Sequence, residues 1–392
     1  MTETRQVQAS SARAQDEMLP FLNNFHDIFT TIGVVILLAG LGVGAGQVMI
    51  GLGLEEGEQG WQNALMALVG GIGLFAWLLS ALLVGKQRRI LPGIVLATVF
   101  GIATGVVLLW GYAQFLVHGA GLDEAALERT FDGVDGMAFG REAVALVLAQ
   151  LPVTIRVMPV IAGLAFLLPV TAYYLSFRLP FAGGLMGLGV VLTAVMTLLV
   201  VDPYLVVINA PAIIVMVGLA LLLGGILFDM RDPGRETRLS GTAFWLHFFA
   251  APILLGAVLN VTQIGWTLQE SDFADPQSVN LFAAMASDSA EAFRLAVTAL
   301  VVIGLFALVS LLINRRALIV SGLVTAGVSI GVIVNASDLG AGAVVAVTLL
   351  VLGGVVVLLG AAWNPVRRLL LLPIPQAGPL ARIFPPVSAV EG

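Results

Sequence analysis

The sequence is dominated by continuous apolar runs of about twenty residues or more, joined by short polar connections. Because about 20 apolar residues cross the hydrocarbon core of a bilayer as an α-helix, each run is long enough to span a membrane. Strands of membrane β-barrels alternate apolar and polar residues over about ten positions, and these runs do not. The pattern predicts an all-α, polytopic transmembrane helical bundle of about ten spans, at approximately 30–52, 61–84, 91–116, 157–177, 182–201, 205–228, 243–263, 294–313, 317–335 and 341–363.

The composition agrees with this fold class and excludes several functions. Of the 392 residues, 59% are hydrophobic and 11% charged, so no large soluble domain fits between the spans. The net charge is -6 and the basic residues are scattered, which argues against binding to nucleic acid. The chain has no cysteine, which excludes disulfides, thiolate catalysis and cysteine-ligated metal centres.

The basic residues predict the orientation of the spans through the positive-inside rule. With the N-terminus in the cytoplasm, 14 of the 18 lysines and arginines fall in cytoplasmic segments, and every short inner connection holds at least one arginine. We therefore expect both termini in the cytoplasm. The predicted domains are a cytoplasmic N-terminal segment (1–28), a single transmembrane domain (29–363) and a cytoplasmic C-terminal tail (364–392).

Three amphipathic or short apolar segments stand outside the regular pattern. Around the first span, Phe21, Phe25 and Phe29 share one helical face, which is typical either of a helix lying in the membrane interface or of an extension of the span. The two longer outer loops, 117–156 and 264–293, are both acidic. Within them, the stretches 143–151 and 276–287 are too short to span and suit interfacial or re-entrant helices.

The loop lengths suggest a parallel internal repeat of residues 90–228 and 242–363. Ser176–Leu185 occupies the same place in the first half as Ile313–Leu323 does in the second, and Asp202 corresponds to Asp338. Such repeats are common in transporters, although other membrane proteins also duplicate helices.

Glycines at close spacing predict where the helices approach one another. Gly101 with Gly105 and Gly327 with Gly331 form small-xxx-small pairs, and Gly40 to Gly46 form a row in the first span. These faces are mainly structural. They are also the surfaces through which protein partners or a homo-oligomer would bind, beside the membrane lipids that any such chain contacts. The glycine row does not have dinucleotide-binding spacing.

Few residues could carry chemistry within the membrane. Every Asp, Glu, Lys and Arg falls in a loop or at a span end, which argues against carriers built around a carboxylate at the bilayer centre. We identify no catalytic residue, metal site or cofactor site. The seventh span is the most polar, and its candidate ligand-binding residues are His247, Asn260 and Gln263. His247 and Asn260 lie about 20 Å apart along a helix and cannot share one site.

His247 has two interpretations. It is either an interfacial histidine satisfied by a backbone carbonyl, or a contact for a proton or ligand. The connection before it carries Arg231, Arg235 and Arg238, which satisfy the orientation rule and can contact anionic lipid headgroups. An arginine trio can also bind a phosphorylated or carboxylate ligand, so these three are further candidates. Ser240 or Thr242 is expected to cap the seventh helix.

Two stretches of the chain, the connection leading into the seventh span and the end of the tenth span, resemble a group of bacterial polytopic inner-membrane proteins of unknown function. The first has the pattern D-P-x-R-x-T-R-x-S followed by A-F-W-L-H-x-x-A-A-P, and the second has the pattern W-x-P-x-R-R. The matching residues are Asp232, Pro233, Arg235, Thr237, Arg238, Ser240, Ala243–His247, Ala250–Pro252, Trp363, Pro365, Arg367 and Arg368. The resemblance implies a multi-pass protein of a bacterial inner membrane and implies no activity.

Two functions are compatible with these observations. The ten spans and the suggested repeat favour a transporter or permease for a small or lipid-like molecule. The scarcity of polar lining counts against transport, and it fits a hydrophobic substrate better than an ion or sugar. The alternative is a non-catalytic accessory or scaffold protein that binds partners or lipids through glycine-rich faces. A membrane-embedded enzyme is less favoured, because no acid, base or metal-binding groups converge in the sequence.

Overall fold

The computed structural model describes residues 25–53, 59–119, 141–233, 235, 237–264, 290–335, 341–374, 380 and 383–385. All regular secondary structure in these ranges is helical, as predicted. Nine of the described helices are long and apolar enough to cross a membrane. A tenth candidate is bent by 48° between Ala317–Leu323 and Thr325–Val334. The prediction of an all-α polytopic bundle of about ten spans is confirmed.

The described helices fall into two compact units, called unit 1 and unit 2 here. The helices of unit 1 are α2 (Phe25–Gly51), α3 (Gln59–Ser80), α4 (Leu91–Gln114), α7 (Val153–Arg156), α8 (Met158–Phe177) and α9 (Pro180–Val201). The helices of unit 2 are α10 (Pro203–Ile208), α11 (Ala210–Arg231), α12 (Arg238–Ile264), α14 (Ala290–Ile313), α15 (Ala317–Asn335) and α16 (Ala341–Leu371). Two π-helical turns extend the unit 1 helices, Ala81–Lys86 after α3 and Phe115–Gly119 after α4.

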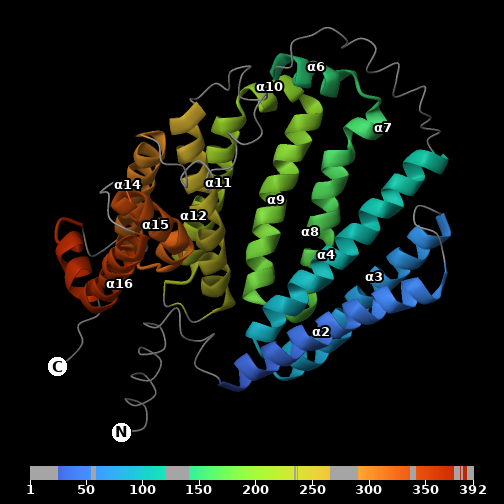
Figure 1. Ribbon diagram of the computed structural model, residues 1–392, viewed down its shortest axis with the longest axis horizontal. Coiled ribbons are helices and arrows are strands. Elements are labelled where there is room, and N and C mark those ends of the chain that lie inside the picture. Colours follow the sequence, from blue (N-terminus) through green and yellow to red (C-terminus); the bar gives the residue numbers. More distant parts are fainter. Residues whose placement is uncertain are drawn as a thin grey trace. The chain divides into compact units, whose positions relative to one another are not determined.

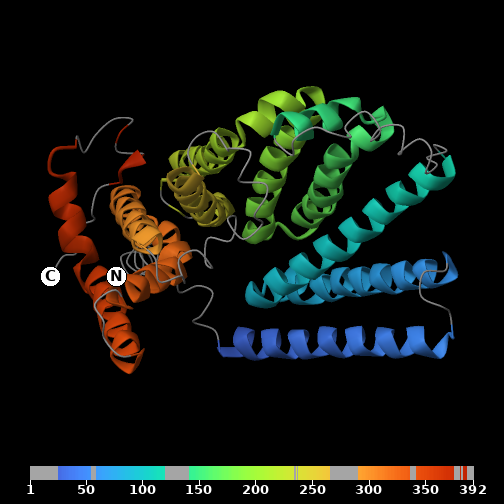
Figure 2. The same cartoon turned by 45° about the horizontal axis from the view of Figure 1, so that its top comes forward.

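The helices of unit 1 pack in chain order. The hairpin of α3 and α4 contacts α8 through α4, α8 pairs with α9, and α2 lies against α3 and α4 (Figures 1 and 2). The predicted face of Gly101 and Gly105 meets α8: a Cβ at Gly105 would lie 3.1 Å from the Ala165 carbonyl oxygen. The Tyr173 hydroxyl donates to Ser80 Oγ across 2.8 Å in the interior of this unit.

The helices of unit 2 surround α12, which packs against α11, α14 and α15. Leu255 and Leu259 of α12 form a buried core with Leu295 and Ala299 of α14. Buried residues make up 61% of the most apolar stretch of α12, against at most 33% in the other candidate spans. The predicted pair of Gly327 and Gly331 on α15 faces α16 at Leu352 and Thr348.

Four short connections share an unusual backbone conformation. Among the described residues, Arg88, Arg178, Arg235 and Asn314 are the non-glycine residues with positive φ, between 50° and 56°. Each lies in one helix-to-helix turn, α3–α4, α8–α9, α11–α12 or α14–α15. The left-handed conformation costs about 1–2 kcal/mol for residues with a Cβ, so the tight turns impose it. These are the arginine-containing turns that the orientation argument assigned to one side of the membrane.

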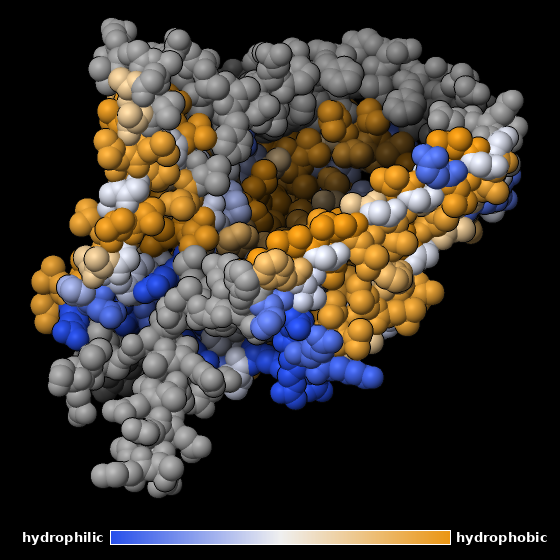
Figure 3. Space-filling model, turned by 60° about the horizontal axis from the view of Figure 1, so that its bottom comes forward, coloured by the Kyte–Doolittle hydropathy of each residue, from blue (hydrophilic) through white to orange (hydrophobic). Residues whose placement is uncertain are grey.

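Within each unit these turns lie close together. In unit 1, a Cβ at Gly93 would lie 3.4 Å from Leu179, which joins the α3–α4 and α8–α9 turns. In unit 2, Arg235 donates to the Asn314 carbonyl across 2.8 Å. Apolar side chains cover the described helices, and hydrophilic residues gather toward helix ends (Figure 3). The chain is therefore an integral, multi-pass membrane protein.

Several segments predicted from the sequence correspond to helices of the structure. The short helix α6 (Arg141–Gln150) matches the helix expected at 143–151. Phe25 to Phe29 belong to the continuous helix α2, as the interpretation of a span extension requires. The sixth span ends at Arg231 instead of 228, so Asp229 lies inside α11. Residues 276–287 and Asp338 lie outside the described residues, and the repeat stays a prediction.

Candidate functional site

A network of buried polar side chains lies at one end of unit 2. Asp229 comes from the last turn of α11, Ser240 and His247 from α12, and Arg315 from the α14–α15 turn. Asp229 is four residues after Gly225, and His247 is seven residues after Ser240, so each pair shares one helix face. Because α11 and α12 pack against each other, these faces bring Asp229, Ser240 and His247 close together.

The Asp229 carboxylate is the centre of this network. Arg315 Nε donates to Asp229 Oδ2 across 3.0 Å, and Arg315 Nη2 donates to Asp229 Oδ1. His247 Nε2 lies 3.1 Å from the same Oδ2. Arg315 Nη2 also donates to Ser240 Oγ across 3.1 Å. This two-point contact between a guanidinium and a carboxylate is the strongest geometry available to an ion pair.

Burial makes the network energetically demanding. The side chain of His247 is fully buried, that of Arg315 is 2% exposed and that of Asp229 is 13% exposed. Taking two charges out of water costs several kcal/mol each, and their mutual attraction offsets this only with good geometry. With a neutral imidazole, Asp229 and Arg315 balance each other.

Among the described residues, only one of the two ring nitrogens of His247 has a hydrogen-bond partner. Because an ionised carboxylate can only accept, Nε2 carries the proton that is donated to Asp229. The other nitrogen, Nδ1, is buried and has no hydrogen-bond partner among the residues that the structure describes. The ring packs against the backbone of α11 at Gly225, where a Cβ would lie 2.7 Å from Cε1 and 2.9 Å from each ring nitrogen. Gly225 therefore provides the space that the ring occupies.

A second layer of contacts holds the Arg315 turn. Arg235 donates to the carbonyl oxygens of Asn314 and Ile313 across 2.8 and 3.0 Å, where α14 ends. Trp363 Nε1 of α16 donates to Asn314 Oδ1 across 3.0 Å. The Arg316 guanidinium lies 5.1 Å from the centre of the Trp363 ring. The turn is thus fixed by α11–α12 on one side and by α16 on the other.

The predicted candidates do not form one site. His247 is buried in the network, and its partner is a carboxylate, so the expectation of a backbone carbonyl is wrong. Arg231 and Arg238 are exposed at the ends of α11 and α12. Arg235 contacts the end of α14. Asn260 is half-buried farther along α12, and the side chain of Gln263 lies outside the described residues.

The predicted caps of α12 are also wrong. The helix begins at Arg238, and Thr237 Oγ1 accepts from the Leu239 amide across 3.2 Å. Asp232 Oδ2 in turn accepts from the amide and the hydroxyl of Thr237, across 2.9 and 2.6 Å. Ser240 is therefore the third residue of the helix, in its first turn, where its hydroxyl accepts from Arg315.

Sequence reasoning missed Asp229, Arg315 and Asn314 as members of a site. In the sequence, Arg315 is one of the inner-turn arginines that indicate only orientation, and Asp229 follows directly after the predicted end of the sixth span at 228. One available signal was the spacing of Gly225 and Asp229 at the end of an apolar run, opposite Ser240 and His247. The partner from the α14–α15 turn has no local signal, because it lies 86 residues from Asp229 in the sequence.

Metal binding and similarity to known proteins add no further residues. Within the described ranges, no three His, Asp or Glu side chains come together in a group that could hold a metal ion. Comparison with known protein families, characterised proteins and solved structures found no match.

Proposed function

We propose that the protein is a transporter or permease for a small or lipid-like molecule in a bacterial inner membrane, and that the network of Asp229, His247 and Arg315 closes one end of unit 2. The observation that carries this proposal is an ionisable network between two spans and the turn joining two others, in which His247 and Arg315 are buried and Asp229 is only 13% exposed. The motifs around Asp232 and Trp363 support the bacterial inner membrane.

The free-energy cost of burying these charged groups favours a functional role for the network over a purely structural one. Apolar residues of similar volume would join α11, α12 and α14 at least as stably as a buried ion pair does. Ionisable groups in membrane spans are rare, pair with one another and mark substrate or proton pathways in transport proteins. An ion-pair network can separate and re-form, which is what alternating access requires of a closed end.

The position of the network suits a gate more than a substrate site. His247 lies nine residues into α12, about 13 Å from the start of the helix, and Asp229 is in the last turn of α11. Farther along α12 than His247, the residues Ala251, Leu254 and Ala257 are all buried against neighbouring helices. A path along this helix would be apolar, so the substrate class is small and apolar or lipid-like.

The proposal is tested by cysteine labelling, since the chain has no cysteine of its own. Single cysteines at Ala251, Leu254 and Ala257 are labelled with a membrane-impermeant maleimide from each side of sealed vesicles. A gate predicts slow labelling in the parent protein and labelling at least several-fold faster, from one side, when Asp229→Asn is added. The matched control is Asp202→Asn, which removes an exposed carboxylate after α9.

The same measurement can contradict the proposal. If the three cysteines stay unlabelled from both sides, with and without Asp229→Asn, the network is a permanent structural contact and not a gate. Should Asp229→Asn yield unfolded protein, Ser240→Ala replaces it, because this change removes only one contact to Arg315. The labelling rate then decides in the same way.

A scaffold or accessory function is the second candidate, and one observation favours it. A Cβ added at Gly40, Gly42, Gly44 or Gly46 of α2 would have no atom within 4 Å among the described residues, apart from the adjoining backbone of α2 itself. This open row could receive a helix of a partner protein. Absence of labelling along α12, together with co-purification of a partner that is lost on Gly44→Leu, would favour this function over transport.

A further inference from the structure

The C-terminal part of the chain returns to the end of unit 2 that carries the buried network. Its described residues there are Leu380 and residues 383–385, called the C-terminal strap here. The Phe384 amide donates to the Leu380 carbonyl across 2.8 Å, which closes one turn. Pro385 and Pro386 follow in the sequence, and because proline has no amide hydrogen they prevent a longer helix.

Phe384 is the apolar contact of the strap. Its side chain packs against the buried cluster of Ala251, Ile313 and Leu318. Ile313 and Leu318 flank the α14–α15 turn, which supplies Arg315 to the network. Ala251 follows His247 by one helical turn on α12. The strap therefore lies against the segments that carry both partners of the Asp229 carboxylate.

Arg367 of α16 joins the strap to the end of α14. This residue is 2% exposed. Its Nε donates to the Leu311 carbonyl across 2.9 Å, and its Nη2 donates to the Pro385 carbonyl. Leu311 is in the last turn of α14, four residues before Arg315. Hydrogen bonds from a charged guanidinium are stronger than those between neutral groups, so Arg367 connects the strap firmly to the segment that carries Arg315.

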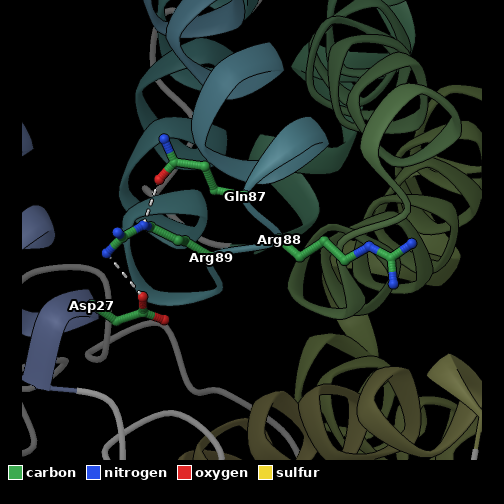
Figure 4. A pocket seen from close by; sticks show the side chains of 4 residues that line it. All are labelled: Asp27, Gln87, Arg88 and Arg89. Carbon is green, nitrogen blue, oxygen red and sulfur yellow. Dashed lines mark hydrogen bonds and ion pairs between the residues drawn. The ribbon is translucent and has the colours of Figure 1, made fainter.

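A turn of unit 1 is held by a contact of a different kind. Arg89 of the α3–α4 turn contacts the Asp27 carboxylate at 3.3 Å and donates to the Thr30 hydroxyl across 2.7 Å (Figure 4). Both partners belong to α2, a long helix that packs on α3 and α4. The strap is a single turn in which Leu380 is exposed and Phe384 is half-buried. It can therefore leave its position at a lower free-energy cost than a packed helix can.

We propose that the C-terminal strap is an autoinhibitory contact that holds the buried network of unit 2 closed. With the strap in place, Phe384 and Arg367 fix the α14–α15 turn where the Arg315 guanidinium reaches Asp229. When the strap leaves, the turn loses these contacts, and Arg315 can separate from Asp229 through the movement of a short segment. This inference rests on the proposed gate and names the part of the chain that regulates it.

The test uses the full-length protein with single cysteines at Leu254 and Ala257. These positions are on α12 and do not belong to the cluster that Phe384 contacts. Their labelling by a membrane-impermeant maleimide in sealed vesicles is compared between the parent protein and Phe384→Ala. The matched control is Leu380→Ala, because this side chain of the same turn is 43% exposed. Asp27→Ala, which breaks the end contact of unit 1, controls for a general loss of stability.

We expect labelling from one side to become about tenfold faster in Phe384→Ala and to stay unchanged in Leu380→Ala and Asp27→Ala. Because the strap acts through the network, adding Phe384→Ala to Asp229→Asn should give no further increase. Phe384→Leu keeps an apolar side chain and should give an intermediate rate. It replaces Phe384→Ala if that variant yields unfolded protein.

The outcomes separate this inference from the proposed gate. Faster labelling in Asp229→Asn without a change in Phe384→Ala overturns the strap and leaves the gate. Equal increases in Phe384→Ala and Leu380→Ala, or an additive increase in the double variant, also overturn the strap. No change in Asp229→Asn overturns the gate, and with it a strap that acts on the network.

Discussion

His247 Nε2 donates to Asp229 Oδ2 across 3.1 Å between two adjacent membrane helices, at a point where α11 has no side chain to separate them. The ring lies over Gly225, one helical turn before Asp229. A hydrogen bond between helices is thus combined with a close approach of ring and backbone. The contact depends on the glycine as much as on the two polar residues.

Gly225→Ala is expected to break this contact. Its Cβ would lie 2.7 to 2.9 Å from three atoms of the His247 ring, so the ring must leave its position. Overpacking of this kind costs about 1–3 kcal/mol, more than the helix propensity that alanine gains over glycine. Thermal unfolding in detergent should show a lower midpoint for Gly225→Ala. The neighbouring Gly224→Ala, whose Cβ would first meet Leu246 at 3.8 Å, should be unchanged or slightly more stable.

Removing one charge of the network should cost more than removing both. Asp229→Asn leaves the Arg315 guanidinium buried without a counter-charge, a loss of about 3–5 kcal/mol in comparable pairs. The double variant Asp229→Asn with Arg315→Met should recover most of that loss. A double-mutant cycle of unfolding free energies measures the coupling. Additive effects of the two changes would contradict a direct ion pair.

Asn314 should show two separable contributions. Its φ of 56° favours glycine or asparagine, and its side-chain oxygen accepts from Trp363 Nε1 across 3.0 Å. Asn314→Gly loses the hydrogen bond and keeps the backbone conformation, whereas Asn314→Ala loses the bond and adds strain. We expect the alanine variant to be less stable than the glycine variant by about 1 kcal/mol. Equal stabilities would mean that the turn does not require a left-handed residue.

The fold class could be predicted from the sequence because it depends on local composition. Each run of about twenty apolar residues must satisfy its backbone hydrogen bonds internally in a membrane, and a helix is the local solution. The basic turns were predictable for the same reason, since Arg88, Arg178, Arg235 and Arg315 interrupt these runs. Helix ends were less certain: Asp229 was placed in a loop although α11 continues to Arg231.

The candidate site was harder to predict because it joins distant segments. His247 stood out as a lone histidine in an apolar span, but its partner could not be identified without the packing of α11 on α12. Arg315 belongs to a third segment, and its burial is a property of the folded bundle. Arg231 and Arg238 formed a convincing cluster with Arg235 in the sequence. The start of α12 and the end of α11 leave both exposed, while Arg235 turns to the end of α14.

Glycine spacing gives a last and contrasting prediction. The row from Gly40 to Gly46 has the strongest small-residue pattern, yet an added Cβ at these glycines would meet no other described part of the chain within 4 Å. Gly163 belongs to none of the glycine pairs singled out in the sequence, and its Cβ would lie 2.8 Å from Thr193 Oγ1 and 3.1 Å from Thr193 Cα. Because the second contact is with backbone, α8 and α9 would have to separate.

Gly163→Ala should therefore lower the unfolding midpoint of the protein in detergent, with a loss of about 1–3 kcal/mol. Gly40→Ala and Gly111→Ala, which have open space, are the matched controls and should leave the midpoint within experimental error. The opposite result would be a lower midpoint for Gly40→Ala and an unchanged midpoint for Gly163→Ala. In that case the glycine row of α2 must pack against a helix of another molecule in the purified protein. That result would support an oligomer formed through the glycine row, whose dissociation could then be followed by the concentration dependence of the midpoint.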